Sequence, residues 1–273
     1  MIIIDMKNLK IYCVTNKILN FLDDSNYNIG WVGNEQPPKN YILCNTKDNI
    51  FSKEQYYSEL TFQYWYWKNK LDINEKSWIG FCQKRRYWIK KNSTNIKIDK
   101  KNFRDHILVD VPEEWNNFES IICTPIFVNN VKKIKMLKRG MKSIFKKPEI
   151  FFNESKQTIA FHFDMHHGYG NLKKAIELVD IEDRQDFLNF VNTSVSYNPH
   201  IMFIAKADIV NKWFNVLFPW LSRCEREFGF EKLKGYDTQR LYAYLAERYL
   251  SFWFNKHAKS LSWPWVLFDA SQK

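Results

Sequence analysis

The sequence predicts an α/β protein, a single domain of two lobes in which strands alternate with amphipathic helices. Residues 9–15 alternate apolar with more polar side chains and include β-branched ones, which is typical of a strand. Residues 78–82 form an apolar run that is too short for a helix and follows a polar turn, which indicates a buried strand. Between these strands, residues 56–69 have the three- and four-residue apolar spacing of a helix. A chain of 273 residues is long enough to bury a substantial core.

The helix between the two strands is expected to begin near Lys53. Ser52 and Gln55 stand three residues apart and form a capping box that would open it. One apolar stripe then follows, made of Tyr56, Leu60, Tyr64 and Trp67. Glu59 lies on a neighbouring face, where it is the one acidic residue of the aromatic segment 56–69.

Both predicted strands end in polar residues. Lys84, Arg85 and Arg86 follow the second strand, and ligands of open α/β sheets bind outside the carboxyl ends of strands. These cations are therefore expected where an anion such as a diphosphate would lie. The first strand ends at Asn16-Lys17, in a turn that would face a nucleotide. No glycine-rich fingerprint accompanies this turn, so a purely structural turn remains an alternative.

The remaining elements are predicted in chain order. They are a strand over 119–128, a lysine-rich amphipathic stretch over 131–147, a helix over 171–186 packed on the sheet, a strand over 197–205, an apolar helix over 207–228 and a last helix from Asp237. Pro219 predicts a kink or break in the apolar helix. The lysine-rich stretch is either a solvated face or a contact with a membrane or polyanion.

Two groups of polar residues have open interpretations. His162, Asp164, His166 and His167 resemble a ligand cluster, which could bind a metal, exchange protons, contact substrate or be structural. Arg240 and Glu247 stand seven apart and would share a helix face. They are either a structural ion pair or a pair that faces a sugar or phosphate.

Composition excludes several classes of protein. Aromatic residues make up 17% of the chain, which excludes disorder, and the net charge of +11 predicts attraction to anions. Five cysteines without C-x-x-C spacing are expected to be reduced core residues. No apolar stretch reaches 18 residues, and residues 1–5 are too short for a signal peptide, so we expect a cytoplasmic protein.

An ordered set of motifs resembles one known family. YYSELTFQYWYWKN (56–69), IGFCQKRRYW (79–88), YNPHIMFIAK (197–206), LFPWL (217–221) and QRLYAYLAERYL (239–250) follow the order seen in the domain-of-unknown-function 4422 glycosyltransferases of bacterial capsular and exopolysaccharide biosynthesis. The resemblance covers nearly the whole chain. The departures from the family pattern are Asn16 for a histidine, Ser58 for a cysteine, Gln83-Lys84 for His-Tyr and Pro199 for a methionine. Gln83 puts the site chemistry most in question, because glutamine does not titrate.

The resemblance implies a fold and an activity. The fold would be a glycosyltransferase-A-like, Rossmann-like mixed sheet flanked by helices, with a helix-rich C-terminal part, in one domain over 1–273. The half over about 1–130 would bind a UDP-sugar, and the half over about 131–273 would face the acceptor. A hexosyl unit, with galactose in pyranose or furanose form as one candidate, would pass to a growing capsular polysaccharide or exopolysaccharide.

The resemblance and the residue chemistry together select the candidate site residues. Donor binding is assigned to Thr15, Asn16, Lys17, Asn49, Tyr57, Tyr64, Lys68, Arg85, Arg86, Asn198 and Arg240. Catalytic roles are assigned to Glu59, Arg86, Asp164, His166 and Glu247, of which the carboxylates and the histidine are candidate bases. No Asp-x-Asp motif is present, so Arg85 and Arg86 would supply some or all of the charge that stabilises the leaving diphosphate, and dependence on Mn²⁺ or Mg²⁺ stays open.

The expected partners are a UDP-sugar and a glycan acceptor, for which a lipid-linked form is one alternative. Peripheral contact at the cytoplasmic face of the inner membrane is a further alternative, and no specific nucleic acid is expected. Two rival interpretations remain. The first is a nucleic-acid-binding protein, since basic residues alternate with aromatic ones at 84–88. The second is a glycan-binding relative that has lost activity through Asn16 and Gln83.

Overall fold

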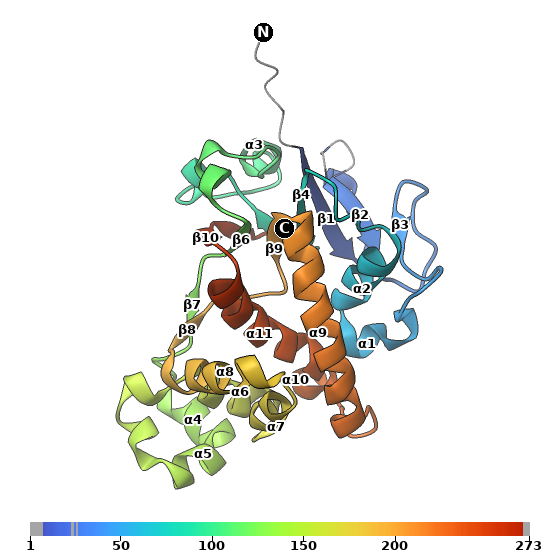
Figure 1. Cartoon of the computed structure of the whole chain (residues 1–273). Coiled ribbons are helices and arrows are strands. Elements are labelled where there is room, and N and C mark those ends of the chain that lie inside the picture. The colour runs from blue at the N-terminus through green and yellow to red at the C-terminus, as the bar shows by residue number, and fades with distance from the viewer. Residues whose placement is uncertain (1–7, 23–24, 26, 270–273) are drawn as a thin grey trace.

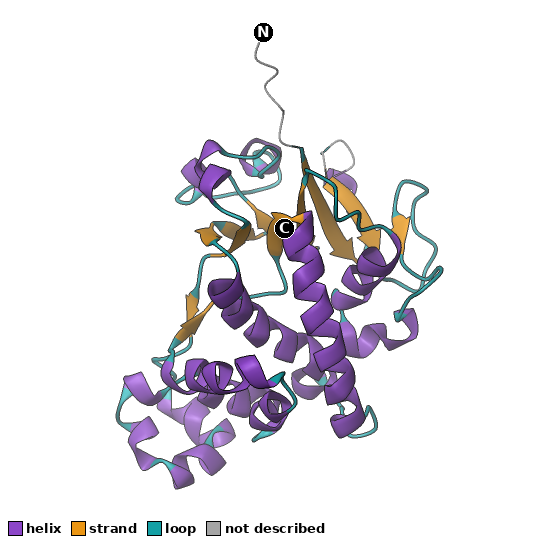
Figure 2. Ribbon diagram, viewed as in Figure 1, coloured by secondary structure: helices purple, strands orange, loops and turns teal. Residues whose placement is uncertain are grey.

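The computed structural model describes residues 8–22, 25 and 27–269 (Figure 1). Residues 1–5, on which the prediction about a signal peptide rests, lie outside the described part. Strands occupy the upper part of the molecule and helices dominate the lower part (Figure 2). None of the helices in the described ranges combines the length and hydrophobicity that a membrane crossing requires.

Within the described residues a mixed sheet of nine strands forms the centre, which agrees with the mixed sheet that the family resemblance implies. Its main path runs β10 (Ser260–Trp263), β6 (Ser120–Cys123), β9 (Phe203–Lys206), β4 (Trp78–Gln83), β1 (Leu9–Thr15), β2 (Tyr27–Trp31) and β3 (Ile42–Leu43). Strands β4, β1, β2 and β3 are parallel, whereas β9 is antiparallel to both β4 and β6. Strand β5 (Arg86–Trp88) folds back on β4 and pairs with β11 (Trp265–Leu267). Both halves of the chain therefore contribute strands to the sheet.

Two hydrophobic cores cover the two faces of this sheet. Because side chains alternate along a strand, Trp78 and Cys82 of β4 face one core while Ile79 and Phe81 face the other. All six residues of β4 are buried, which confirms the predicted buried strand. The core that contains Phe81 also holds the apolar faces of α2, α9 and α11, and the second core is closed by residues 89–118.

The helices have the following bounds. They are α1 (Glu54–Tyr57), α2 (Leu60–Asn69), α3 (Phe103–His106), α4 (Lys133–Arg139), α5 (Met141–Lys146), α6 (Ile159–His167), α7 (Asn171–Glu177), α8 (Ile181–Thr193), α9 (Ala207–Phe228), α10 (Tyr236–Gln239) and α11 (Leu241–His257). Helices α4 to α8 gather in one lobe, at the lower left of Figure 1, and α6 and α8 connect it to α11. A small two-stranded sheet, β7 (Ile126–Phe127) with β8 (Ser196–Tyr197), lies between this lobe and the main sheet.

The predicted long helix after residue 52 is wrong in one respect, because it breaks at Ser58. Ser58 has φ of 52° and ends α1, and α2 begins two residues later. The predicted capping box is also absent. The preceding turn is instead held by Asn49, whose side-chain oxygen accepts a hydrogen bond from the Phe51 amide at 3.0 Å. An Asx turn has therefore replaced the helix cap.

Other predicted elements also divide. The strand expected over 119–128 is two strands, β6 and β7, and the helix expected over 171–186 ends at Glu177 before α8 begins at Ile181. Helix α7 packs mainly against α6 and α8, not on the sheet. Of the kink or break expected at Pro219, the break is absent, since α9 continues through this residue. All five cysteines are free and buried, as predicted.

Candidate active site

A cleft opens at the carboxyl ends of β1 and β4. Its lining comes from five separate parts of the chain. The lining residues are Val14, Thr15, Asn16, Val32, Glu54, Ser58, Glu59, Lys84 and Arg240. This is the edge of the sheet at which α/β proteins bind ligands, and it is where the sequence places the candidate site.

The turn after β1 is held by the Thr15 side chain. The Thr15 hydroxyl donates to the Lys17 carbonyl at 2.7 Å and accepts from the Lys17 amide at 2.9 Å. The Lys84 ammonium group donates to the Asn16 side-chain oxygen, which connects this turn to the end of β4. Asn16 and Lys84 therefore form one rim of the cleft, and the Lys17 residue beside them is exposed.

The break at Ser58 brings two carboxylates to the same cleft. Residues five apart in a continuous helix point about 140° away from each other. The positive φ of Ser58 turns the chain, so that Glu54 and Glu59 both line the cleft. Burial raises the pKa of Glu54, and Glu59 raises it further, while Arg240 and Lys84 act in the opposite direction. Glu54 is not among the site residues predicted from the sequence, because spacing alone places it on a different helix face from Glu59.

Two cations face these carboxylates. Burial lowers the pKa of Lys84, as do Lys17, Arg85 and Arg240, and Glu59 partly offsets this. Arg240 lies at the junction of α10 and α11, and it has no ion-pair partner within 4 Å among the residues that the structure describes. The cleft thus holds a half-buried ammonium and an unpaired guanidinium, groups that favour a phosphate ligand.

The hairpin that joins β4 to β5 separates the three cations that follow β4. Lys84 faces the cleft, and Arg85 lies near Asp269, with 3.6 Å between their charged atoms. Arg86 donates to the Gln83 side-chain oxygen at 3.2 Å and does not line the cleft. Arg86 forms no ion pair within the described ranges, with Glu59 or with any other carboxylate.

A second polar cluster lies beyond Arg86 and contains Glu247. Its carboxylate accepts hydrogen bonds from the Arg248 guanidinium and from the His200 amide. Of the two interpretations of Arg240 and Glu247, the structural ion pair is wrong, because the helix is interrupted at Arg240 and only Glu247 belongs to α11. Glu247 is therefore the counter-ion of the adjacent residue Arg248.

Arg248 is the most deeply buried charge of this cluster. Only 1% of its surface is exposed, and its guanidinium lies 4.2 Å from the centre of the Tyr197 ring. Its neighbour His200 has φ of 70°, an uncommon conformation for a residue other than glycine. Burial, with help from Arg86 and Arg248, lowers the pKa of His200 to about 2. His200 is therefore neutral at physiological pH.

Several predicted donor-binding residues form structural contacts outside the cleft lining. Asn198 is buried, and its amide donates to the Cys123 carbonyl at 2.7 Å. The Tyr57 hydroxyl donates to Glu225 at 2.9 Å. The Tyr64 hydroxyl donates to Asp48 at 3.1 Å, the Lys68 ammonium lies 3.5 Å from the centre of the Trp67 ring, and Asn49 holds the turn described above. These contacts fix α1 and α2 and the turn before β9, so they shape the surroundings of the cleft.

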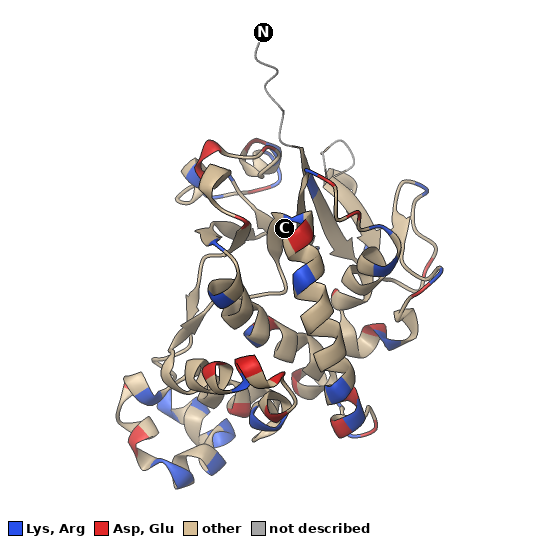
Figure 3. Cartoon of the chain, viewed as in Figure 1, with Lys and Arg blue, Asp and Glu red and all other residues tan. Residues whose placement is uncertain are grey.

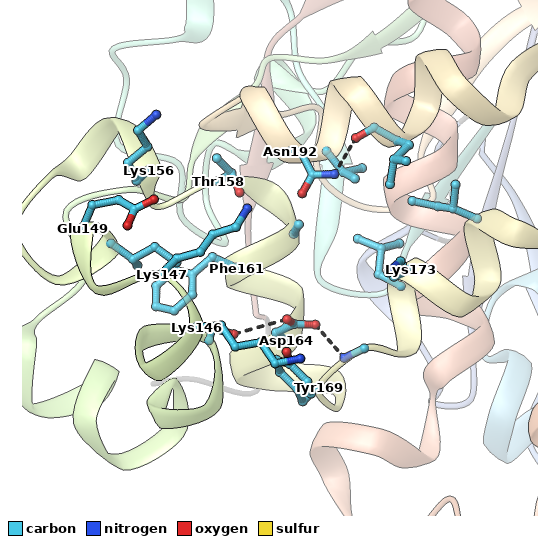
Figure 4. Close-up of a pocket in the computed structure, with 18 residues that line it drawn as sticks. Lys146, Lys147, Glu149, Lys156, Thr158, Phe161, Asp164, Tyr169, Lys173 and Asn192 are labelled. Atoms are coloured by element: carbon cyan, nitrogen blue, oxygen red, sulfur yellow. Dashed lines mark hydrogen bonds between the residues drawn. The ribbon is translucent and has the colours of Figure 1, made fainter.

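The structure places the α6 candidates Asp164 and His166 apart from the cleft. Asp164 accepts hydrogen bonds from the Gly170 amide at 2.9 Å and the Ser143 hydroxyl at 3.2 Å, and it lines a different pocket (Figure 4). Burial raises the pKa of Asp164 and lowers that of His166. Within the described part of the chain, no three His, Cys, Asp or Glu residues are arranged to hold a metal ion.

The fold is that of a glycosyltransferase. The chain superposes on the apo structure of WbbM, a bifunctional glycosyltransferase, with a TM-score of 0.70 and 18% identity, over 96% of this chain and 46% of that one. The chain therefore spans less than half the length of WbbM. A match to the mannosyltransferase Ktr4p from S. cerevisiae covers 89% of this chain and 62% of that one at 10% identity, and its TM-score of 0.25 is too low for any argument. No curated protein sequence matches.

The chain belongs to the family described as Domain of unknown function (DUF4422), whose model matches residues 10–258. The family predicted from the ordered motifs is thereby confirmed, and so is the glycosyltransferase-like α/β fold.

Proposed function

We propose that this protein transfers a hexosyl unit from a UDP-sugar to a growing capsular polysaccharide or exopolysaccharide. UDP-galactose, in its pyranose or furanose form, is one candidate donor. One observation carries the proposal: Lys84 and Arg240 converge with Glu54 and Glu59 at the carboxyl ends of β1 and β4, in a protein with a glycosyltransferase fold. The cytoplasm, where nucleotide sugars are available, is the proposed location.

The two cations would bind the donor diphosphate. When the bond between the sugar and the diphosphate breaks, negative charge develops on the diphosphate. Fixed cations that counter this charge lower the free-energy barrier of the transfer. Lys84 and Arg240 belong to different elements, so they can hold the diphosphate from two sides.

The two carboxylates are the candidate bases for the acceptor hydroxyl. Direct displacement requires a group that takes the proton as the hydroxyl attacks the sugar. Glu59 was a candidate from the sequence, and Glu54 joins it because its raised pKa moves it toward the range of an effective general base. Two carboxylates with two adjacent cations are a poor donor set for Mn²⁺ or Mg²⁺, which prefer several oxygen ligands. We therefore assign charge neutralisation to Lys84 and Arg240.

A thermal-shift screen tests the proposal. The purified protein is heated with UDP, other nucleoside diphosphates and their sugars, each with and without Mn²⁺. A ligand at about 100 times its Kd adds roughly 2.7 kcal/mol to the free energy of unfolding, so we expect a clear increase in Tm with UDP or a UDP-sugar. If no nucleotide changes the Tm, the transferase proposal is refuted.

A turnover assay then distinguishes an active transferase from an inactive glycan-binding relative, since both would bind UDP. Release of UDP from a UDP-sugar, in the presence of acceptor glycan, supports a transferase. Tight UDP binding without any turnover would favour the glycan-binding relative that has lost activity.

A further inference from the structure

The surface formed by α4 and α5, residues 131–147, has the highest density of positive charge in a chain of net charge +11. We call it the basic hairpin. Its 17 residues include seven lysines and one arginine and no acidic residue. Figure 3 shows these cations gathered on the lobe at the lower left, far from the end of the molecule at which β1 begins. A solvated face usually mixes both signs of charge, so an unbroken cationic surface of this length calls for an anionic partner.

The same surface exposes large apolar side chains. Ile134 and Leu137 of α4 are 70% and 49% exposed, and Met141 and Phe145 of α5 are 40% and 77% exposed. The two pairs have spacings of three and four residues, so each pair lies on one face of its helix. Phe152, shortly after the hairpin, is 81% exposed. Exposed apolar side chains that cluster are typical of interaction sites.

The exposed pairs lie opposite the residues that attach the hairpin to the protein. Met136 is buried with Ile150, Phe161 and Met165 in a separate small core. On α5, the Ser143 hydroxyl donates to Asp164 of α6. Each helix therefore has one face fixed to the lobe and an apolar face that stays largely exposed, with lysines beside it.

Lys146 and Lys147, at the end of the basic hairpin, carry its positive charge toward α6. They line a pocket between α5 and α6, and Lys156 and Lys173 line the same pocket (Figure 4). Its other charged lining residues are Glu149 and Asp164, and burial raises the pKa of the latter. Positive charge thus predominates on the hairpin and around the pocket behind it.

We propose that the basic hairpin docks on an anionic lipid surface, with Ile134, Leu137, Met141 and Phe145 inserted at the acyl boundary and the lysines at the headgroup phosphates. Helices that lie in the membrane interface have this combination of an apolar face and flanking lysines. Each lysine near an anionic leaflet contributes to binding, and each inserted apolar side chain adds to it. A nucleic acid would use the same cations but would gain little from isoleucine, leucine and methionine, which do not stack on bases. The inference is independent of the proposed transferase activity.

Co-sedimentation with lipid vesicles tests this docking. Wild-type protein is mixed with vesicles of phosphatidylcholine alone, and with vesicles that also contain phosphatidylglycerol. We expect binding to the anionic vesicles only. The variant Lys138→Gln/Lys142→Gln should bind about 25-fold more weakly, since about 1 kcal/mol per lysine corresponds to about fivefold each. The variant Leu137→Ser/Phe145→Ser should lose at least about tenfold, because its apolar side chains no longer insert.

Two matched variants serve as controls. Ile73→Ser/Ile181→Ser removes apolar side chains that are 55% and 73% exposed elsewhere, and Lys97→Gln/Lys100→Gln removes two exposed lysines elsewhere. Both should bind anionic vesicles like the wild type. All substituted residues are exposed, so every variant should keep the wild-type Tm, which is measured first.

Three results would overturn the proposal. The first is the absence of wild-type binding to anionic vesicles. The second is a loss in the control variants as large as in the hairpin variants. The third result needs a parallel binding assay with duplex DNA. If Leu137→Ser/Phe145→Ser binds vesicles normally, while Lys138→Gln/Lys142→Gln loses binding to both vesicles and DNA, the hairpin is a general polyanion surface.

Discussion

Replacing Glu247 with glutamine distinguishes a structural role from a catalytic one. Glu247 is 14% exposed and is the carboxylate that pairs with Arg248, which is 1% exposed. Glutamine keeps the size of the side chain but removes its charge, so the Arg248 guanidinium is left buried without a counter-ion. Breaking a buried pair in this way typically costs about 3–5 kcal/mol.

The expected change in Tm follows from the chain length. At about 2.1 cal/mol/K per residue, 273 residues have an unfolding entropy of roughly 0.57 kcal/mol/K. A loss of about 3–5 kcal/mol therefore lowers the Tm by about 5–9 °C. Differential scanning calorimetry measures this directly, and Glu227→Gln, at an exposed position on α9, is the control that should leave the Tm unchanged.

A double variant completes the test. Glu247→Gln/Arg248→Met removes both charges and places an apolar side chain of similar length beside Tyr197, so it should recover most of the lost stability. If Glu247→Gln instead melts within about 1 °C of the wild type and loses turnover, the carboxylate acts in the chemistry and the structural reasoning is refuted.

Three further predictions concern activity and pH. Arg86→Ala should fold normally, because Arg86 has no ion pair among the described residues, and it should reduce turnover less than Lys84→Ala does, because Arg86 does not line the cleft. A loss of about 10²-fold in turnover would show instead that its guanidinium stabilises the leaving diphosphate. Burial lowers the pKa of His162 and His200 to about 2 and that of His167 to about 3, so folding favours their neutral forms. The free energy of unfolding therefore has its full value above about pH 6.5, the pKa of histidine in the unfolded chain, and decreases below that pH by up to ~1.4 kcal/mol per pH unit for each histidine. Urea unfolding at pH 7.5 and 5.5 measures this decrease, and equal free energies of unfolding at both pH values would contradict the prediction. EDTA should reduce transfer less than it does in Asp-x-Asp enzymes, and complete loss with rescue by Mn²⁺ would show a metal requirement.

The central strands were predictable because burial dictates their residue pattern. Residues 9–15 form β1 as predicted, and residues 78–82 lie in β4, which is buried over its whole length. The 207–228 helix also has its predicted bounds, since its apolar face is periodic over many turns. The turn after β1 and the cation after β4 were placed at the cleft for a topological reason, because parallel strands end at one edge.

The helix break at Ser58 could not be predicted from local sequence. A positive φ favours glycine, and serine gives no signal for it, so the surrounding tertiary contacts must hold this conformation. Without the break, Glu54 has no reason to join Glu59, and it was missed. The pairing of Glu247 was wrong for a similar reason, because seven-residue spacing assumes one helix, and Arg240 lies before α11 begins.

Isothermal titration of UDP into four purified proteins tests the central claim, that the donor diphosphate binds between Lys84 and Arg240. The proteins are the wild type, Lys84→Ala, Arg240→Ala and the control Lys97→Ala. Lys97 is exposed and does not line the cleft. Each cleft variant should raise the Kd at least about tenfold, since a hydrogen bond to a charged group contributes roughly 1.5–3 kcal/mol. The control should bind like the wild type. Equal affinity for UDP in all four proteins would place the donor site elsewhere and contradict the account.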